Sequence, residues 1–254
     1  MDKNELAAHR EFLKDNLRQE LNFYLTDQNQ GITPPPIQKP PSKEQRQIPL
    51  TETTTWDDFS SPSLISTIAN RRSHRRYQNQ PLSLNELSFL LWATQGCRGV
   101  LAPGTALRTV PSAGCRHPFE TYLAVTAVAG LEPGIYRYLP VDNALVLERS
   151  IELERLQQAL VKGTLNQTFT ATAPVTFIWS VIPARSEWRY HTAAHRVILM
   201  DVGHLCQNLY LACAAIGGGT CAIAAYHQQL MDQLLGVDGE EEFTLYLAPV
   251  GKVE

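Results

Sequence analysis

The feature that most constrains this fold is one long apolar segment running from about Thr192 to Ile216. Its composition predicts a helix, and the three glycines at 217–219 provide its end. Apolar residues fall on nearly every side of that helix, at Val197, Met200, Leu205, Leu209, Leu211, Ala212 and Ile216. Because a helix that is hydrophobic all round needs cover on most sides, we expect it to be central. A sheet should pack on one side, and another helix or a second subunit on the other.

Short runs of β-branched and aromatic residues predict the sheet. Strands are expected at 121–129, 135–138, 144–148, 174–181 and 243–249. Further helices are expected after Ser61-Pro62, after Ser83, where Glu86 completes a capping box, and from Ser150 to about Lys162. The strands and helices lack a regular βαβ rhythm and a GxGxxG turn, so the predicted class is α+β, with the sheet between helices, and not a Rossmann fold.

The first 50 residues differ in character from the rest. Leucines at helical spacing predict a helix over residues 2–25, and five prolines between 34 and 41 follow it. Proline favours extended backbone, so 31–50 is expected to be a tether that crosses a surface, with that of a partner subunit among the candidates. The expected division is an N-terminal extension at 1–50 and one compact domain at 51–254.

Charge and composition exclude several classes of protein. A net charge of -3 and a pI near 6.2 argue against a general nucleic-acid surface. The sequence has no apolar run of the roughly 20 residues that span a bilayer, and its N-terminus lacks the order of a secretory signal, so no membrane association is expected. Five cysteines without a CxxC pair indicate reduced thiols and a cytoplasmic protein.

A basic cluster stands out against this mildly acidic background. Arg71, Arg72, Arg75 and Arg76 lie close to Ser73 at the expected end of a helix. Guanidinium groups and a hydroxyl offer several N–H and O–H donors, which is the arrangement that a phosphate monoester requires. The alternative is a solvated basic turn that pairs with acidic neighbours such as Asp57 and Asp58.

Two small-residue segments are candidates for close contact with a flat ligand. Pro111-Ser112-Ala113-Gly114 follows a loop and precedes a strand, so backbone there can approach a planar ring. An ordinary tight turn explains the same residues. Three consecutive glycines at 217–219 are more than the end of a helix requires. The run is therefore either a functional loop or only a structural break between two elements.

Polar residues on the long helix do not suggest a metal site. His191 and His195 are four residues apart, and Asp201 and His204 are three apart. His195 and His204 are separated by nine residues and so face opposite sides of a helix. No metal is therefore predicted, and Asp201, His204 and Asn208 are read as a hydrogen-bonded network in the core.

Five motifs together carry a family resemblance over about 56–252. They are Arg71-Arg72-Ser73-x-Arg75, the segment 111–114, Gly134-Ile135-Tyr136-Arg137-Tyr138, the segment 201–209 and the segment 247–252. In this order they resemble the SagB-type dehydrogenases, a branch of the FMN-dependent nitroreductase family. The resemblance implies a homodimer with a central, mostly antiparallel sheet and FMN held at the subunit interface.

The resemblance also assigns roles to residues. Arg71, Arg72, Ser73 and Arg75 would hold the phosphate and ribityl chain, and Lys252 would complete that site. Pro111, Ser112, Ala113 and Gly114 would lie along the isoalloxazine, from the partner chain. Ile223, Ala224 and Ala225 fall where the family presents a backbone N–H to flavin N5.

The implied activity is ping-pong hydride transfer at flavin N5, with NAD(P)H as a candidate donor. The substrate would be a planar small molecule or an azoline-type heterocycle, including one within a peptide. The azoline-oxidising branch uses a Lys-Tyr pair, and this chain has Arg189-Tyr190 at the matching place. Arginine is a poor proton acceptor because it stays charged, which leaves Tyr190 as the candidate acid or base. The alternatives are a flavin-binding or partner-binding protein with little turnover and, last, a metal hydrolase.

Overall fold

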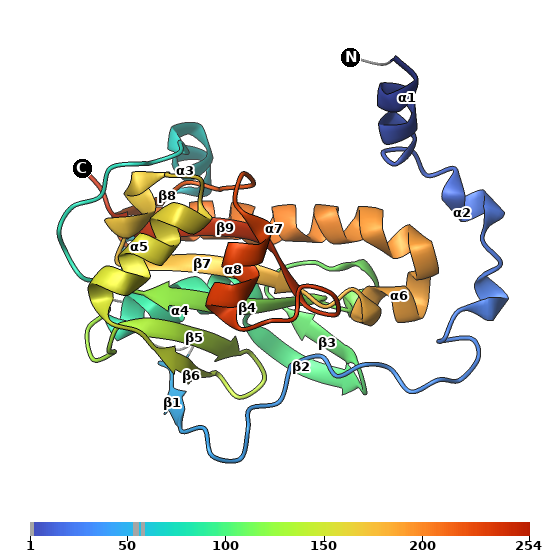
Figure 1. Ribbon diagram of the computed structural model, residues 1–254. Coiled ribbons are helices and arrows are strands. Elements are labelled where there is room, and N and C mark those ends of the chain that lie inside the picture. The colour runs from blue at the N-terminus through green and yellow to red at the C-terminus, as the bar shows by residue number, and fades with distance from the viewer. Residues whose placement is uncertain (1–2, 53–55, 57–58) are drawn as a thin grey trace.

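The computed structural model describes residues 3–52, 56 and 59–254, and a seven-stranded sheet lies at its centre (Figure 1). The strand order is β1-β6-β5-β4-β7-β9-β8, and each neighbouring pair is antiparallel. The strands are β1 (Gln47–Pro49), β4 (Phe119–Val125), β5 (Gly134–Leu139), β6 (Ala144–Ser150), β7 (Val175–Val181), β8 (Gly218–Thr220) and β9 (Phe243–Lys252). A separate hairpin joins β2 (Cys97–Ala102) to β3 (Thr105–Arg108). The predicted α+β class is confirmed.

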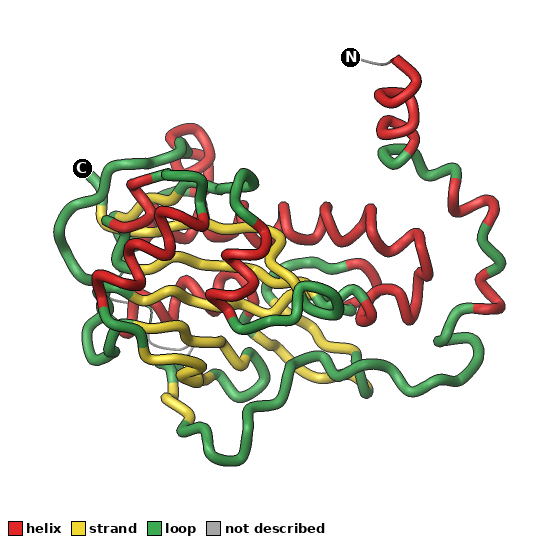
Figure 2. Tube along the Cα trace, in the orientation of Figure 1, coloured by secondary structure: helices red, strands yellow, loops and turns green. Residues whose placement is uncertain are grey.

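Helices cover both faces of the sheet (Figure 2). On one face α4 (Leu84–Gln95) and α7 (Ala194–Ala215) enclose a large apolar core with strands β4, β7 and β9. On the other face α5 (Leu153–Gly163) and α8 (Gln228–Leu235) enclose a smaller one. The capping box at the start of α4 is present as predicted, because Ser83 Oγ accepts from the Glu86 N–H and Glu86 accepts from the Ser83 N–H.

Helix α7 is buried on its sheet side and open on the other. Its buried positions recur every three or four residues, at Ala194, Ile198, Asp201, Val202, Leu205, Cys206, Leu209, Ala212 and Cys213. On the opposite side Leu199 and Met200 are each 47% exposed. The stretch Ala184–Ala215 is long and apolar enough to pass for a membrane span, but its inner face is part of the domain core. This exposed side of α7 is where the expected second helix or subunit would pack.

The short helices depart from the predicted boundaries. The predicted helix over 2–25 is broken into α1 (Lys3–Glu11), α2 (Leu17–Glu20) and a 3₁₀ turn, η1 (Phe23–Leu25). Leu13 and Leu25 are mostly exposed there, so no packed surface supports one continuous helix. Helix α3 (Leu64–Asn70) starts two residues later than expected, because Ser63 and not Ser61 caps it. The remaining helical segments are η2 (Ala113–Cys115), η3 (Thr168–Ala171), α6 (Ala184–Tyr190) and η4 (His191–Ala193).

The proline-rich segment 31–50 crosses the surface of its own chain. Arg108 Nη2 donates to the Ile37 carbonyl at 2.6 Å, and Arg137 Nη1 donates to the Lys39 carbonyl at 2.6 Å. Strand β1 then adds itself to the sheet edge beside β6. In Figure 1 the segment runs beneath the β2–β3 hairpin and α1 stands away from the sheet. Asp15, just before α2, pairs with Arg196 of α7 at 3.0 Å. The expected tether therefore lies on the surface of its own domain.

Buried charges hold this region together. Glu120 is 3% exposed and accepts a hydrogen bond from the Arg185 guanidinium. The second Glu120 oxygen lies 3.6 Å from Arg137 Nη1, and Arg137 Nε donates to Glu148 at 2.6 Å. The Lys39 N–H also donates to Glu120, at 2.8 Å. One buried carboxylate thus joins strand β4, helix α6 and the N-terminal segment.

Candidate functional site

The arginine-rich loop after α3 lies against strand β8. The His74 N–H donates to the Thr220 carbonyl at 2.9 Å, and the Tyr77 hydroxyl donates to the Pro249 carbonyl at 3.0 Å. At Gly219 an added Cβ would lie 2.6 Å from the His74 ring, so only glycine allows this approach. Gly219, the last glycine of the 217–219 run, therefore serves the loop contact and is not needed to end α7.

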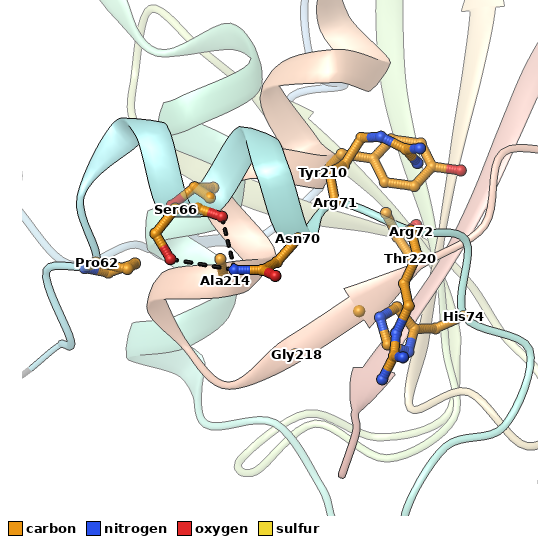
Figure 3. Close-up of a pocket in the computed structure, with 12 residues that line it drawn as sticks. Pro62, Ser66, Asn70, Arg71, Arg72, His74, Tyr210, Ala214, Gly218 and Thr220 are labelled. Atoms are coloured by element: carbon orange, nitrogen blue, oxygen red, sulfur yellow. Dashed lines mark hydrogen bonds between the residues drawn. The ribbon is translucent and has the colours of Figure 1, made fainter.

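Arg71 and Arg72 line a pocket of about 220 Å³ between α3, the end of α7 and β8 (Figure 3). The Arg71 guanidinium lies 5.2 Å from the centre of the Tyr210 ring. Within the described chain, Arg71, Arg72 and Arg75 form no ion pair, and Asp57 and Asp58 lie outside the described residues. Uncompensated guanidinium groups beside glycine backbone suit a phosphate. Ser73 and Arg75 follow directly on the exposed loop.

Tyr210 joins parts of this site that are far apart in sequence. Its hydroxyl lies 2.9 Å from Ser73 Oγ and accepts a hydrogen bond of 2.9 Å from the Ala222 N–H. One side chain of α7 therefore ties the arginine loop to the backbone that leads into 223–225. Sequence reasoning missed it, because a tyrosine within an apolar helix reads as a core residue; its only signal is a hydroxyl that needs a partner.

Replacing Tyr210 with phenylalanine is expected to lower the free energy of unfolding by about 1 kcal/mol, because two hydrogen bonds are lost and the ring remains. Hydrogen exchange should also show a less protected Ala222 amide. Urea unfolding measures the first effect, with Tyr24→Phe as the control, since Tyr24 is 82% exposed. Equal stability of both variants would contradict the role given to the Tyr210 hydroxyl.

The small-residue loop 111–114 is held by Asp201 of α7. Ser112 Oγ donates to Asp201 Oδ2 at 2.5 Å, and the Ala113 N–H donates to Asp201 at 3.2 Å. Burial raises the pKa of Asp201, and the bonds from Ser112 and Ala113 partly oppose that rise. Asp201, His204 and Asn208 were expected to form one network in the core. Asp201 bonds to the loop, and Asn208 donates to the Ala93 carbonyl. His204 is exposed.

Gly114 meets the end of α6. It has φ +60, and an added Cβ would lie 2.6 Å from the Tyr190 hydroxyl and 2.7 Å from Arg189 Cδ. The Arg189 guanidinium lies 5.6 Å from the centre of the Tyr190 ring. The structure therefore brings the candidate acid or base, Tyr190, against the loop expected to carry the flavin ring.

The two halves of the expected site lie at different places along α7 in one chain. Asp201 anchors the loop 111–114, whereas Tyr210 and Ala214 line the arginine pocket. Thirteen residues separate Asp201 from Ala214, which is about 20 Å along a helix. Arg71 and the loop 111–114 therefore lie beside different stretches of the same helix.

The segment 223–225 is anchored at one end and open at the other. Ile223 is buried and pairs with Leu247 through bonds of 2.8 and 3.1 Å. Ala224 and Ala225 are exposed, and neither amide N–H has a hydrogen-bond partner in the part of the chain that the structure describes. Such free N–H groups are able to donate to a ligand.

Lys252 differs from its expected role. Its ammonium group donates to Glu86 and to the Ile216 carbonyl, and Lys252 is not a lining residue of the arginine pocket. The physical reason is local: the carboxylate of the α4 capping box and the C-terminal end of α7 attract the cation. The Lys252 backbone still lies beside Gly218 in the sheet.

His191 and His195, which follow α6, do not form part of a cluster of metal-ligating side chains among the described residues. His195 Nε2 lies 2.7 Å from Glu187 Oε1, and His191 is exposed with φ +48. Across the described ranges, no three His, Cys, Asp or Glu side chains come together in a way that would hold a metal ion.

His117 follows the small-residue loop and is buried beside arginines. Burial first, and then the charge of Arg108, lower its pKa to about 3, while its Nε2 lies 3.0 Å from the Ala106 carbonyl. The neutral ring therefore donates to that carbonyl. Since the pKa in the folded state lies below its unfolded value of 6.5, stability is present above pH 6.5 and is lost as the pH falls towards 3.

His117→Gln is expected to remove the part of the pH dependence of the unfolding free energy that comes from protonation of His117. Between pH 6.5 and 4 the wild type should lose about 1.4 kcal/mol of unfolding free energy per pH unit more than the variant. Urea unfolding at pH 7.5, 6 and 5 measures the difference, with His9→Gln on the exposed face of α1 as the control. Parallel pH curves for the wild type and His117→Gln would contradict the assignment.

The chain matches the nitroreductase family over residues 68–252. It is 34% identical over 195 residues to the nitroreductase-like protein MJ1384 of Methanocaldococcus jannaschii, covering 77% of this chain and 93% of that protein. It is 30% identical over 165 residues to the trifolitoxin-processing protein TfxB of Rhizobium leguminosarum bv. trifolii, covering 62% of this chain but only 44% of TfxB.

Among solved structures, the chain is similar to one in the Escherichia coli microcin synthetase McbBCD complex with truncated pro-MccB17 bound. The TM-score is 0.60 at 22% identity, with 80% of this chain and 79% of that chain covered. This likeness shows the fold, whereas the family match and the processing-protein relatives show the ancestry. The chain belongs to the nitroreductase family of oxidoreductases.

Proposed function

We propose that this protein is a homodimeric FMN-dependent oxidoreductase that works by ping-pong hydride transfer. The observation that carries the proposal is the separation of the two half-sites along α7. A second copy, related by a two-fold axis and with its α7 antiparallel, would bring the arginine pocket of one chain to the 111–114 loop of the other. Two identical sites then result.

The residues present fit FMN. Arg71 and Arg72, with Ser73 and Arg75 beside them, offer charge-assisted donors to the phosphate. From the partner copy, Pro111, Ser112, Ala113 and Gly114 would lie along the ring, and the absence of a side chain at Gly114 lets Tyr190 and Arg189 approach this loop. The free N–H groups of Ala224 and Ala225, following the anchored Ile223, are suited to hydrogen-bond flavin N5. When bound, FMN supplies the two-electron hydride chemistry, and the chain supplies binding, orientation and proton donors.

The open side of α7 supports the dimer. Leu199, Met200 and Gly203 are exposed along it, and the neighbouring α3 has Leu64, Ile65 and Ile68 at 65%, 83% and 56% exposure. Together they form an apolar surface that continues past the arginine pocket. A subunit packed there would bury these side chains and close the pocket from one side.

For the substrate we propose a planar small molecule or an azoline-type heterocycle, with NAD(P)H as one candidate reductant. TfxB is a trifolitoxin-processing protein and the McbBCD structure contains truncated pro-MccB17, which supports a peptide-borne heterocycle. The Tyr190 hydroxyl beside Gly114 is the group placed to give or take a proton at the ring face. Five free cysteines support the expected cytoplasmic location.

The experiment is to purify the protein, record its visible spectrum and follow NAD(P)H oxidation with nitroaromatic, quinone and azoline acceptors. The proposal expects a yellow protein with about one FMN per chain and parallel-line initial-rate kinetics. Tight binding of flavin without turnover would instead support the alternative, a flavin-binding protein without catalytic activity. Arg189 favours that alternative, because arginine cannot accept a proton. A colourless protein that binds no added FMN would contradict the proposal.

A further inference from the structure

Arg189 is a charged side chain with no partner at the proposed substrate site. It lies at the end of α6, half-buried, with its Nε 2.9 Å from the position of an added Gly114 Cβ. Its guanidinium stacks against Tyr190. Nowhere in the described chain does it form a hydrogen bond or an ion pair through its side chain.

A second guanidinium group, that of Arg116, lies close enough to Arg189 for their charges to interact. Arg116 is 1% exposed, lies 4.4 Å from the centre of the Trp188 ring, and has a buried Nη2 without a hydrogen-bond partner. Burial first, and then the charge of Arg189, lower the pKa of Arg116 to about 10. Arg185, the next guanidinium, is already paired with Glu120.

Carboxylates do not compensate this charge. Glu187, on the same short helix, lies 2.7 Å from His195, and Asp201 accepts from Ser112 and Ala113. Two guanidinium groups, Arg116 and Arg189, are therefore left without a counter-charge among the described residues. A partly buried pair of like charges favours the binding of an anion between or beside them.

We propose that Arg189 binds a carboxylate carried by the planar substrate and so selects acidic substrates; the inference rests on the proposed function. The guanidinium fork matches a carboxylate in bidentate geometry. Because it lies directly over Gly114, the carboxylate has to be attached on or next to the flat part of the substrate. At the position where the related enzymes have a lysine, Arg189 would bind the substrate carboxylate and would not accept a proton. Tyr190 would remain available for proton transfer.

The test is calorimetric titration of the purified protein, with its flavin as isolated, with benzoate and with its neutral isostere benzamide. Benzoate should bind at least about tenfold more tightly than benzamide. Arg189→Gln should remove the preference, and Arg189→Lys should keep a part of it, since the charge remains without the fork. Arg155→Gln, on exposed α5 across the sheet, is the matched control and should keep the full preference.

Several outcomes would overturn the inference: equal affinity for benzoate and benzamide, binding of neither compound, or a preference that survives Arg189→Gln. The visible spectrum of the same sample separates this failure from that of the proposed function. A yellow protein without a benzoate preference contradicts only the substrate class. A colourless protein that takes up no FMN contradicts the proposed function, whereas the benzoate comparison still decides whether Arg189 binds carboxylates.

Discussion

Glu120→Gln should lower the free energy of unfolding by about 3–5 kcal/mol, the cost of breaking a buried ion pair. The carboxylate is 3% exposed and accepts from Arg185 and from the Lys39 N–H, with Arg137 at 3.6 Å. Glutamine keeps the size but removes the charge, which leaves the Arg185 guanidinium buried without a counter-ion. Arg137 retains Glu148. Urea unfolding followed by circular dichroism measures the loss.

The control for this variant is Glu154→Gln. Glu154 is exposed in the first turn of α5, and its change should stay within about 0.5 kcal/mol. Because Glu120 also holds the Lys39 N–H, limited proteolysis should cut the segment 31–50 faster in Glu120→Gln. A variant as stable as the wild type, with an equally protected segment, would show that the buried network does not hold the N-terminal segment.

Arg71→Ala should raise the dissociation constant for FMN by about 10- to 100-fold, because a charge-assisted bond to phosphate contributes about 1.5–3 kcal/mol. The fold should survive, since Arg71 is exposed and its guanidinium, among the described residues, lies over the face of Tyr210 without an ion pair. Quenching of FMN fluorescence measures the affinity, and circular dichroism reports the fold.

Arg76→Ala separates a specific contact from general charge. Arg76 is in the same loop and exposed, but it is not among the residues that line the pocket. Its loss should change the dissociation constant by no more than about threefold at physiological salt, where distant surface charges are screened. Riboflavin, which lacks the phosphate, should bind the wild type and Arg71→Ala equally. Equal losses from both variants, or wild-type affinity in Arg71→Ala, would count against the phosphate role.

Periodic patterns explain what the sequence analysis predicted correctly. The long α7, the capping box at Ser83 and the five main strands follow from local spacing and end signals, and all are present. Strands β1 and β8 were not predicted, because each has three residues and forms only by pairing with β6 or β9. The broken helix over 2–25 shows the reverse: helical spacing without a surface to pack on does not hold a helix.

The candidate site was predicted in its parts but not in its arrangement. The arginine cluster and the small-residue loop were recognisable from residue type, whereas their separation along α7 depends on tertiary structure. Tyr210 was missed because its bonds to Ser73 and Ala222 connect residues remote in sequence. Lys252 was assigned to the phosphate from its position in a motif, but Glu86, 166 residues away, binds its ammonium group.

The central claim is that each FMN site is built from two copies of the chain. It is tested by co-expressing two differently tagged variants, Arg71→Ala and Gly114→Val, and isolating the mixed dimer through both tags. Each parent, first shown by circular dichroism to be folded, should hold little FMN at a concentration that is just sufficient to saturate the wild type. The mixed dimer combines one intact arginine pocket with one intact loop, so it should bind about one FMN, against about two in the wild type. A mixed dimer as empty as its parents, or a wild type that binds FMN as a monomer, would contradict the account.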